Sequence, residues 1–215
     1  MTQEGTSPGG APLLSPVAQA ALLVAIAGFT DAVGFLRYQA FACQMTGNTL
    51  LLALSVFHRS WGQSFYYVAM IACFVLGVLA ASGLLRAGRS PVLALCIAAG
   101  SLTLCSFIGL KWASPLLGFA MGMQTAAATR FGAARIGTVY ITGDLQRLFE
   151  AVAARLWPRP GAAPTAGIGI LALVWLEYLG GGLIGALADL TFRHALLIPA
   201  AILPFVLLRR RREPG

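Results

Sequence analysis

The feature that most constrains this chain is a series of long apolar stretches with little polar sequence between them. The stretches are Val17 to Leu36, Ser64 to Leu85, Val92 to Leu110, Ala113 to Thr129, Ala166 to Leu187 and Ala195 to Leu208. A helix needs roughly 17 to 25 residues to cross ~30 Å of hydrocarbon. The fourth stretch is at the lower limit of this range, and the sixth is below it. Hydrophobic residues form 58% of the 215 positions and charged residues 10%, whereas about a quarter of the residues of a soluble domain are charged. We therefore predict an all-α polytopic membrane bundle of about six transmembrane helices.

The net charge of +8 comes from 15 basic against 7 acidic residues. We interpret the positions of the basic residues as a signal of membrane topology. Basic residues concentrate in cytoplasmic loops, so the run Arg209 to Arg212 after the last apolar stretch predicts a cytoplasmic C-terminus. Nucleic acid is excluded as a partner, because no folded domain remains to carry a basic surface with stacking aromatics. The lipid bilayer is the partner that the composition implies.

The ends of the chain complete the domain organisation. No Lys or Arg precedes Arg37, so we expect the first apolar stretch to be retained as a span and not cleaved as a signal peptide. We expect a disordered tail over residues 1–16, one transmembrane domain over 17–208 and a basic cytoplasmic tail over 209–215. The four cysteines lack metal-ligand spacing and are interpreted as packing residues, so no metal or other cofactor is expected.

Three motifs occur in the same order in both halves of the chain. The first half holds Gly28 to Ala32, Met45 to Asn48 and Phe74 to Gly77, and the second half holds Gly122 to Ala126, Ile141 to Asp144 and Tyr178 to Gly181. The offsets are 94 from Gly28 to Gly122, 96 from Thr46 to Thr142 and 104 from Gly77 to Gly181. This weak repeat divides the domain into repeat one, 17–110, and repeat two, 113–208.

Charge decides whether the segments after the two TG motifs, Thr46 to Phe57 and Thr142 to Leu156, cross the membrane. If neither crosses, there are six spans with both termini inside, and eleven basic residues are inside against four outside. If both cross, there are eight spans and the ratio falls to eight against six. The positive-inside rule favours six. Three spans per half would make the halves an inverted repeat, a recurring transporter architecture with short helices at a midplane site.

The motifs GFTDAVGFL and MTGNT, followed by a second TG motif, resemble the YoaK-like family of bacterial membrane proteins, a family of unknown function. The resemblance covers about Val17 to Leu208. Two positions depart from the family pattern, Thr125 and Asp144, where that family usually has Asn. The resemblance implies a multi-pass protein of the bacterial inner membrane and no established activity.

Asp31 is the sharpest candidate for a functional residue. A carboxylate facing lipid costs roughly 2.5 to 3.5 kcal/mol on insertion scales, so Asp31 must face protein, water or a cation. Either it coordinates an ion or proton in a central cavity, or it is structural, capping the helix start at Thr46, Gly47 and Asn48 or pairing with Arg37.

The two TG motifs are typical of helix N-caps, with Thr or Asn as the side-chain acceptor. At membrane depth the free amides of Thr46, Gly47 and Asn48 would attract an anion or a carbonyl oxygen. Thr142 and Gly143 would repeat the device, although Asp144 could instead prefer a cation. The alternative is a cap that only begins a buried helix.

Two further polar residues lie within apolar stretches, Glu177 and Gln124. An ionisable residue within a span is a functional candidate; alternatively, Glu177 pairs with a cation such as Arg147.

The small-residue pairs Gly118/Gly122 and Gly181/Gly185 favour close helix packing, within the fold or in a homo-oligomer. No catalytic motif or nucleophile–base pair is present, so we do not expect an enzyme.

These observations lead to one functional hypothesis and one rival. The hypothesis is a small-solute or ion transporter, or channel-like permease. Its polar midplane site comprises Asp31, Thr46, Gly47, Asn48, Gln124, Thr142, Gly143, Asp144 and Glu177. The rival is a non-transporting scaffold or regulatory partner in which these residues only join the helices.

Overall fold

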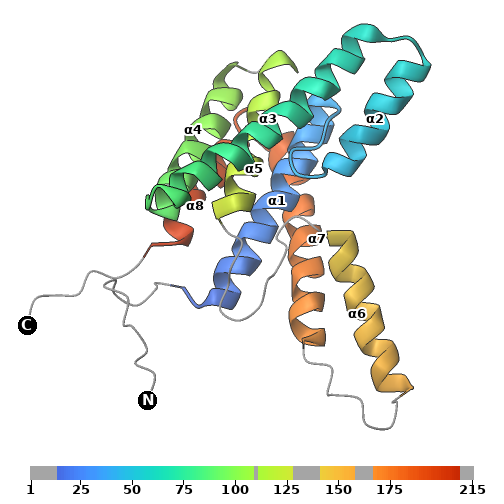
Figure 1. Cartoon of the computed structure of the whole chain (residues 1–215), viewed down its shortest axis with the longest axis vertical. Helices are drawn as coiled ribbons and strands as arrows, with labels where there is room; N and C mark the ends of the chain where they lie inside the picture. The colour runs from blue at the N-terminus through green and yellow to red at the C-terminus, as the bar shows by residue number, and fades with distance from the viewer. Residues whose placement is uncertain (1–13, 109–110, 128–140, 158–166, 209–215) are drawn as a thin grey trace, which may run out of the picture.

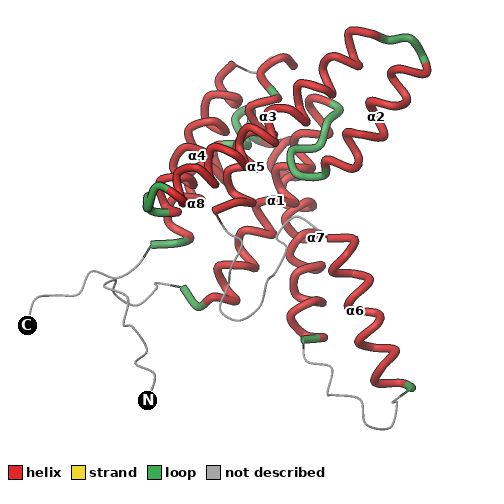
Figure 2. The backbone as a smooth tube through the Cα atoms, in the orientation of Figure 1, coloured by secondary structure: helices red, strands yellow, loops and turns green. Residues whose placement is uncertain are grey.

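The computed structural model describes residues 14–108, 111–127, 141–157 and 167–208, all of which form helices or the loops between them (Figures 1 and 2). The elements are α1 (Pro16–Tyr38), α2 (Met45–Phe57), α3 (Trp61–Arg86), α4 (Pro91–Ile108), a 3-10 turn (Lys111–Ala113), α5 (Pro115–Ala127), α6 (Ile141–Leu156), α7 (Ile168–Thr191) and α8 (Leu197–Val206). The predicted all-α class is confirmed. Positions 1–13 of the predicted N-terminal tail, and the basic tail, lie outside the described residues.

The first helix has clear start and stop signals. Ser15 caps α1, since its hydroxyl accepts the backbone N–H of Ala18 at 3.2 Å, and Pro16 occupies the first position. The helix ends at Gln39, which takes a left-handed conformation with φ of 56° and donates its N–H to the carbonyl of Phe35. This left-handed residue turns the chain away from the helix axis and starts the loop that leads to α2.

Among the described residues, four helices are long and apolar enough to cross a membrane: α1, α3, α4 and α7. In α3 the most apolar 18-residue window has a mean hydropathy of 2.5, yet only 17% of that window is buried inside the protein. Large side chains such as Leu79, Leu187 and Leu190 face outward. An apolar surface of this extent requires a hydrocarbon environment. The helices α5 and α8, with 13 and 10 residues, are shorter than the predicted stretches that contain them, so the count of six spans stays a prediction.

Two pairs of helices approach closely through glycine. On the α1–α7 pair, a Cβ at Gly28 would clash with the carbonyl oxygen of Tyr178, and a Cβ at Gly185 would lie 2.6 Å from the carbonyl oxygen of Phe29. On the α3–α5 pair, Cβ atoms at Gly77 and Gly122 would clash with backbone oxygens in the same way. Both pairs are parallel, because the contacting residue numbers rise together. The packing faces predicted from Gly118/Gly122 and Gly181/Gly185 are therefore used within the fold.

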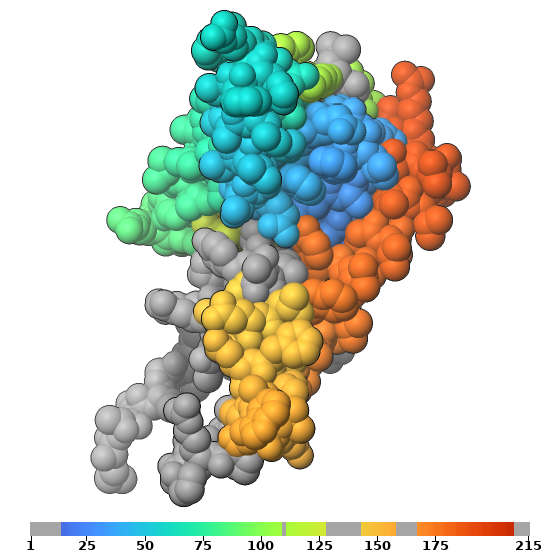
Figure 3. All heavy atoms as spheres, turned by 90° about the vertical axis from the view of Figure 1, so that its right-hand side faces the viewer, coloured from blue at the N-terminus to red at the C-terminus, as the bar shows by residue number. Residues whose placement is uncertain are grey.

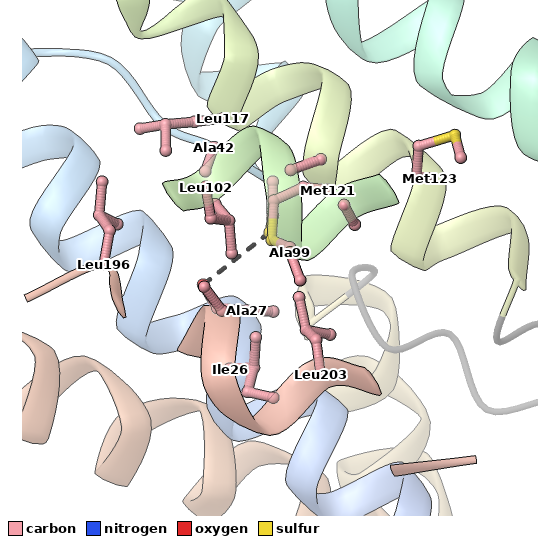
Figure 4. Close-up of a cluster of buried hydrophobic side chains, with 14 of the residues drawn as sticks. Ile26, Ala27, Ala42, Ala99, Leu102, Leu117, Met121, Met123, Leu196 and Leu203 are labelled. Carbon is pink, nitrogen blue, oxygen red and sulfur yellow. Dashed lines mark hydrogen bonds between the residues drawn. The ribbon is translucent and has the colours of Figure 1, made fainter. Parts of the chain in front are cut away.

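The centre of the bundle is built where α1 crosses α5, with α4 and α8 packed beside them (Figure 4). Along this crossing Gly34 lies near Leu117, and the Thr30 hydroxyl lies 3.0 Å from the Met121 sulfur. Further along, Gln124 binds the Leu23 carbonyl. The numbers rise on α5 as they fall on α1, so these two helices run antiparallel. Fully buried Ala27, Leu102, Leu117, Met121 and Leu203 fill the space between the helices.

The two helices that begin at the TG motifs, α2 and α6, pack on the outside of the central helices. α2 packs against α3, where the hydroxyls of Ser55 and Ser64 lie 2.9 Å apart, and α6 packs against α7. Figures 1 and 3 show α2 toward one end of the molecule and α6 toward the other. The two helices therefore extend from the middle of the bundle in opposite directions.

The glycine contacts generate a first prediction. We expect Gly28→Ala and Gly122→Ala each to lower stability by about 1–3 kcal/mol, because the added methyl group has no room against the backbone of the facing helix. The measurement is thermal unfolding of the purified protein in detergent. Gly100→Ala is the control: nothing lies within 4 Å of a Cβ at that position. Equal losses in all three variants would contradict the packing described.

Candidate functional site

Asp31 lies on the face of α1 that meets both α7 and the loop before α2. Its carboxylate is almost completely buried, with 3% of the residue exposed. One oxygen accepts the backbone N–H of Cys43 at 2.7 Å, and the other accepts the hydroxyl of Tyr178 at 2.6 Å. Charge-assisted bonds of this length are among the stronger hydrogen bonds in proteins. Asp31 thus joins α1 to the loop that follows it and to α7, whose Tyr178 is 147 positions away in the sequence.

The expected pairing of Asp31 with Arg37 is wrong. Arg37 forms an ion pair with Asp189 at the far end of α7 and donates to the carbonyls of Arg193 and Phe192 at 2.6 and 3.0 Å. These bonds satisfy carbonyl groups that follow the end of α7. Arg37 therefore connects the ends of α1 and α7. Asp31 is free of Arg37 and binds the loop before α2.

Asn48 holds the same loop from the side of α2. Its side-chain oxygen accepts the N–H of Phe41 at 2.9 Å, and its amide nitrogen donates to the carbonyl of Phe41 at 2.7 Å. Asn48 is fully buried, and this two-point contact satisfies both ends of its amide. The Phe41 ring lies beside Gly47, where a Cβ would come within 2.8 Å of it.

The predicted N-cap at the first TG motif is wrong in its details. Helix α2 begins at Met45 after Gln44, and no side chain caps it. Thr46, Gly47 and Asn48 are therefore inside the first turn. Thr46 is exposed, and Asn48 binds the preceding loop because the loop folds back over the helix start. The Gln44 side chain instead donates to the Tyr178 hydroxyl at 3.3 Å.

The second TG motif also lies inside the first turn of its helix, since α6 begins at Ile141. Thr142 and Gly143 are the second and third residues of that helix, and the side chain of Thr142 lies outside the described residues. Asp144 is buried, with 2% exposed, and one of its oxygens pairs with Arg147 at 3.3 Å. Arg147 thus pairs with Asp144, and the alternative in which Glu177 pairs with Arg147 is wrong.

Gln124 and Glu177 differ in their surroundings. Gln124 is fully buried on α5, and its amide nitrogen donates to the Leu23 carbonyl at 2.9 Å. Glu177 is half-buried on α7, and no ion pair reaches it within the described part of the chain. Neither side chain is hydrogen-bonded to the group around Asp31.

The structure therefore brings together two of the predicted residues, Asp31 and Asn48, through the loop of residues 39–44. Sequence reasoning missed Tyr178, which completes the site from α7. The available signal was the repeat: Tyr178 occupies the position that Phe74 has in the first half, so a hydroxyl is present where the first half has only a ring.

The long apolar helices, the outward apolar surface and the buried polar site define a multi-pass helical membrane protein. The chain belongs to the family described as Protein of unknown function (DUF1275), whose model matches residues 19–208. It is similar to the UPF0700 transmembrane protein YoaK of Bacillus subtilis (strain 168), at 28% identity over 199 residues, which cover 86% of this chain and 88% of the relative. The resemblance to the YoaK-like family is confirmed. No solved structure matches the chain.

The hydrogen bonds at Asp31 generate a second prediction. Tyr178→Phe removes the donor to a buried carboxylate, and we expect a loss of about 1.5–3 kcal/mol in unfolding free energy. Tyr67→Phe is the matched control, because its hydroxyl donates to the neutral carbonyl of Gln39 at 3.1 Å and its loss should be about 0.5–1.5 kcal/mol. Chemical unfolding in mixed micelles measures both. A smaller loss in the Tyr178 variant than in the control would contradict a charged bond at Asp31.

Proposed function

We propose that this protein is a small-solute or ion transporter, or channel-like permease, of the bacterial inner membrane. Its site would lie near the membrane midplane between two inverted halves, and no enzymatic activity is part of the proposal. One observation carries it: the helices pair by a single scheme that is used twice. Inverted halves with short helices and a midplane site are a recurring transporter architecture.

The glycine contacts support equivalence of the halves at the level of single atoms. A Cβ at Gly28 would meet the oxygen of Tyr178 and the nitrogen of Gly182, and a Cβ at Gly122 would meet the oxygen of Phe74 and the nitrogen of Val78. The pairs differ by 94 on the first helix of each half and by 104 on the third, which are the offsets of the repeat motifs. The same helix-to-helix register is thus present in both pairs.

The direction of the helices supports inversion. α1 and α5 are equivalent under the repeat and run antiparallel through the centre of the bundle. A two-fold axis in the membrane plane reverses directions in this way, whereas a parallel repeat would keep them. The first helix of each half also packs on the third helix of the other half: α1 contacts α7, and α5 contacts α3. In this proposal the boundary between the halves therefore runs through the centre of the bundle.

The two short helices support the position of the site. At ~1.5 Å per residue, the 13 residues of α2 and the 16 of α6 extend ~20 and ~24 Å, less than the ~30 Å of a hydrocarbon core. Buried polar groups gather at their starts, with Asn48 on α2 and Asp144 on α6. Buried polar groups at membrane depth are characteristic of substrate and ion pathways.

The bonding of Asp31 favours the rival function. Both oxygens of its carboxylate are already occupied by protein donors. A non-transporting scaffold or regulatory partner would use Asp31 only to join α1, α7 and the loop. In the transporter, the same bonds would have to open for Asp31 to meet a solute. Whether the protein forms homo-oligomers stays a prediction.

The proposed topology has six spans with both termini in the cytoplasm, and it generates a third prediction. In a variant with all four cysteines replaced by alanine, a cysteine at Arg59 should react with a membrane-impermeant maleimide from outside the cell. A cysteine at Arg155, at the end of α6, should react only from inside. Both side chains are exposed. Labelling of both positions from the inside would indicate eight spans and a parallel repeat.

Flux through liposomes tests the function and gives a fourth prediction. Light scattering would follow entry of KCl, NaCl, ammonium chloride, glycine and glycerol into vesicles that contain the purified protein. We expect at least one to enter faster than into empty vesicles, and Asp31→Asn or Asn48→Ala to abolish the difference. Glu150→Gln, on the exposed face of α6, is the control and should keep it.

The outcomes separate the rivals. Folded protein that admits none of the five solutes faster than empty vesicles supports the scaffold. Flux that is unchanged in both site variants, with both folded, would remove Asp31 and Asn48 from the site.

A further inference from the structure

Two buried side-chain atoms have no hydrogen-bond partner within the described residues, and both are acceptors. They are Oε1 of Gln124, on a residue that is fully buried, and Oδ2 of Asp144, on a residue that is 2% exposed. Each residue has already used its other polar atom, since Gln124 donates to the Leu23 carbonyl at 2.9 Å and Asp144 binds Arg147 at 3.3 Å. The polar interior thus has an excess of acceptors.

The orientation of the Gln124 amide is fixed by its partner. The Leu23 carbonyl can only accept a hydrogen bond, so the NH₂ group must face it and the oxygen must point elsewhere. Rotating the amide would set two oxygens against each other. The excess acceptor at Gln124 therefore follows from the chemistry of the contact.

The excess belongs to the second half of the chain. At the offset of 94, Gln124 corresponds to Thr30, whose hydroxyl is bonded to the carbonyls of Ile26 and Ala27. At the offset of 96, Asp144 corresponds to Asn48, whose amide is bonded at both ends to Phe41. Equivalent positions are thus satisfied in the first half and left with a free acceptor in the second.

We propose that the ligand of the interior is a small monovalent cation, a proton, ammonium or an alkali ion, and that it binds Asp144 at Oδ2. Gln124 supplies a further acceptor for the same class of ligand. The inference rests on the proposed function, since it names the chemical class that the midplane site takes. It also decides between the two expectations for the TG motifs, because an anion would bring more acceptors to a site that already has too many.

The energetics favour an occupied site. A buried acceptor left without a partner costs about 1–3 kcal/mol, and a charged one costs more. Arg147 offsets only part of this cost, because it reaches the other oxygen and 64% of its side chain is exposed to its surroundings. A single carboxylate that already pairs with Arg147 through one oxygen suits no more than one further positive charge, and no group of three acidic, His or Cys side chains suited to a divalent metal occurs in the described segments.

Within the described segments, the other charged groups on α6 are Arg147, Glu150 and Arg155, and those on α7, the helix packed against it, are Glu177 and Asp189. Asp189 is paired with Arg37, and the Tyr178 hydroxyl is bound to Asp31. Glu177 is the remaining acid on α7, so a test of proton binding must include it.

The experiment is thermal unfolding of the full chain in detergent at constant ionic strength. Chlorides of sodium, potassium, lithium and ammonium are compared with choline chloride, which is too large to reach a buried oxygen, and a pH series tests the proton. Sodium sulfate and phosphate test anions. We expect one small cation, or the proton, to raise the midpoint saturably, by about 5–10 °C at a hundredfold excess over the dissociation constant.

The variants assign the effect to a residue. Asp144→Asn should abolish the rise and Gln124→Met should weaken it, whereas Glu150→Gln should keep it. A rise that is lost in Glu177→Gln but kept in Asp144→Asn would overturn the assignment to Asp144. An effect that survives Asp144→Asn, stabilisation by the anions alone, or the absence of any rise over choline and across the pH series would overturn the proposal.

A direct measurement on the wild-type protein keeps the proposal testable if a variant does not fold. Titration calorimetry of the wild-type protein with the same four chlorides, together with proton uptake on acidification, should give saturable binding of one ligand, and binding of none would overturn the proposal. Neither method needs transport. Cation binding without flux would support the cation site and contradict the transporter function. Flux without cation binding would support the transporter function and contradict the cation site.

Discussion

Backbone contact at glycine holds this bundle together. In a membrane the apolar side chains gain little from packing on one another, since lipid is equally apolar, so helix association depends on close van der Waals contact and interhelical hydrogen bonds. Gly28 against α7 and Gly77 against α5 supply the close contact. The remaining elements depend on these two pairs: α2 and α6 pack on their outer helices, and α4 and α8 pack beside the crossing of α1 and α5.

The buried polar groups supply the second kind of association, and they are distributed unequally. Around Asp31 every donor and acceptor named above has a partner, and the loop of residues 39–44 is held from α1, α2 and α7. Around Asp144 one carboxylate oxygen has none in the described segments. In the first half the buried polar groups are hydrogen-bonded, and in the second half this acceptor is free within the described part of the chain. This difference would suit a transporter in which one half anchors the helices while the other half meets the ligand.

Much of the fold could be predicted because its signals are local and periodic. Apolar length identified α1, α3, α4 and α7, and the pairs Gly118/Gly122 and Gly181/Gly185 marked faces of close packing. The cap at Thr46 was mispredicted, because the same residues suit a cap or a first turn and only the preceding loop decides between them. The repeat marks the position of Tyr178 but not its partner, since the hydroxyl binds Asp31, which is 147 positions away. Long-range partners of this kind leave no local pattern.

The exchange of helices between the halves has a consequence for synthesis of the protein. α1 leaves the ribosome well before α7, so α1 enters the membrane long before its glycine-lined partner exists. During that interval Asp31 lacks the hydroxyl of Tyr178, and the close-packing face of Gly28 is open to lipid. The first half is therefore an incomplete unit, and a ribosome that stalls after α4 would leave in the membrane a fragment in which one oxygen of the Asp31 carboxylate has no donor from α7.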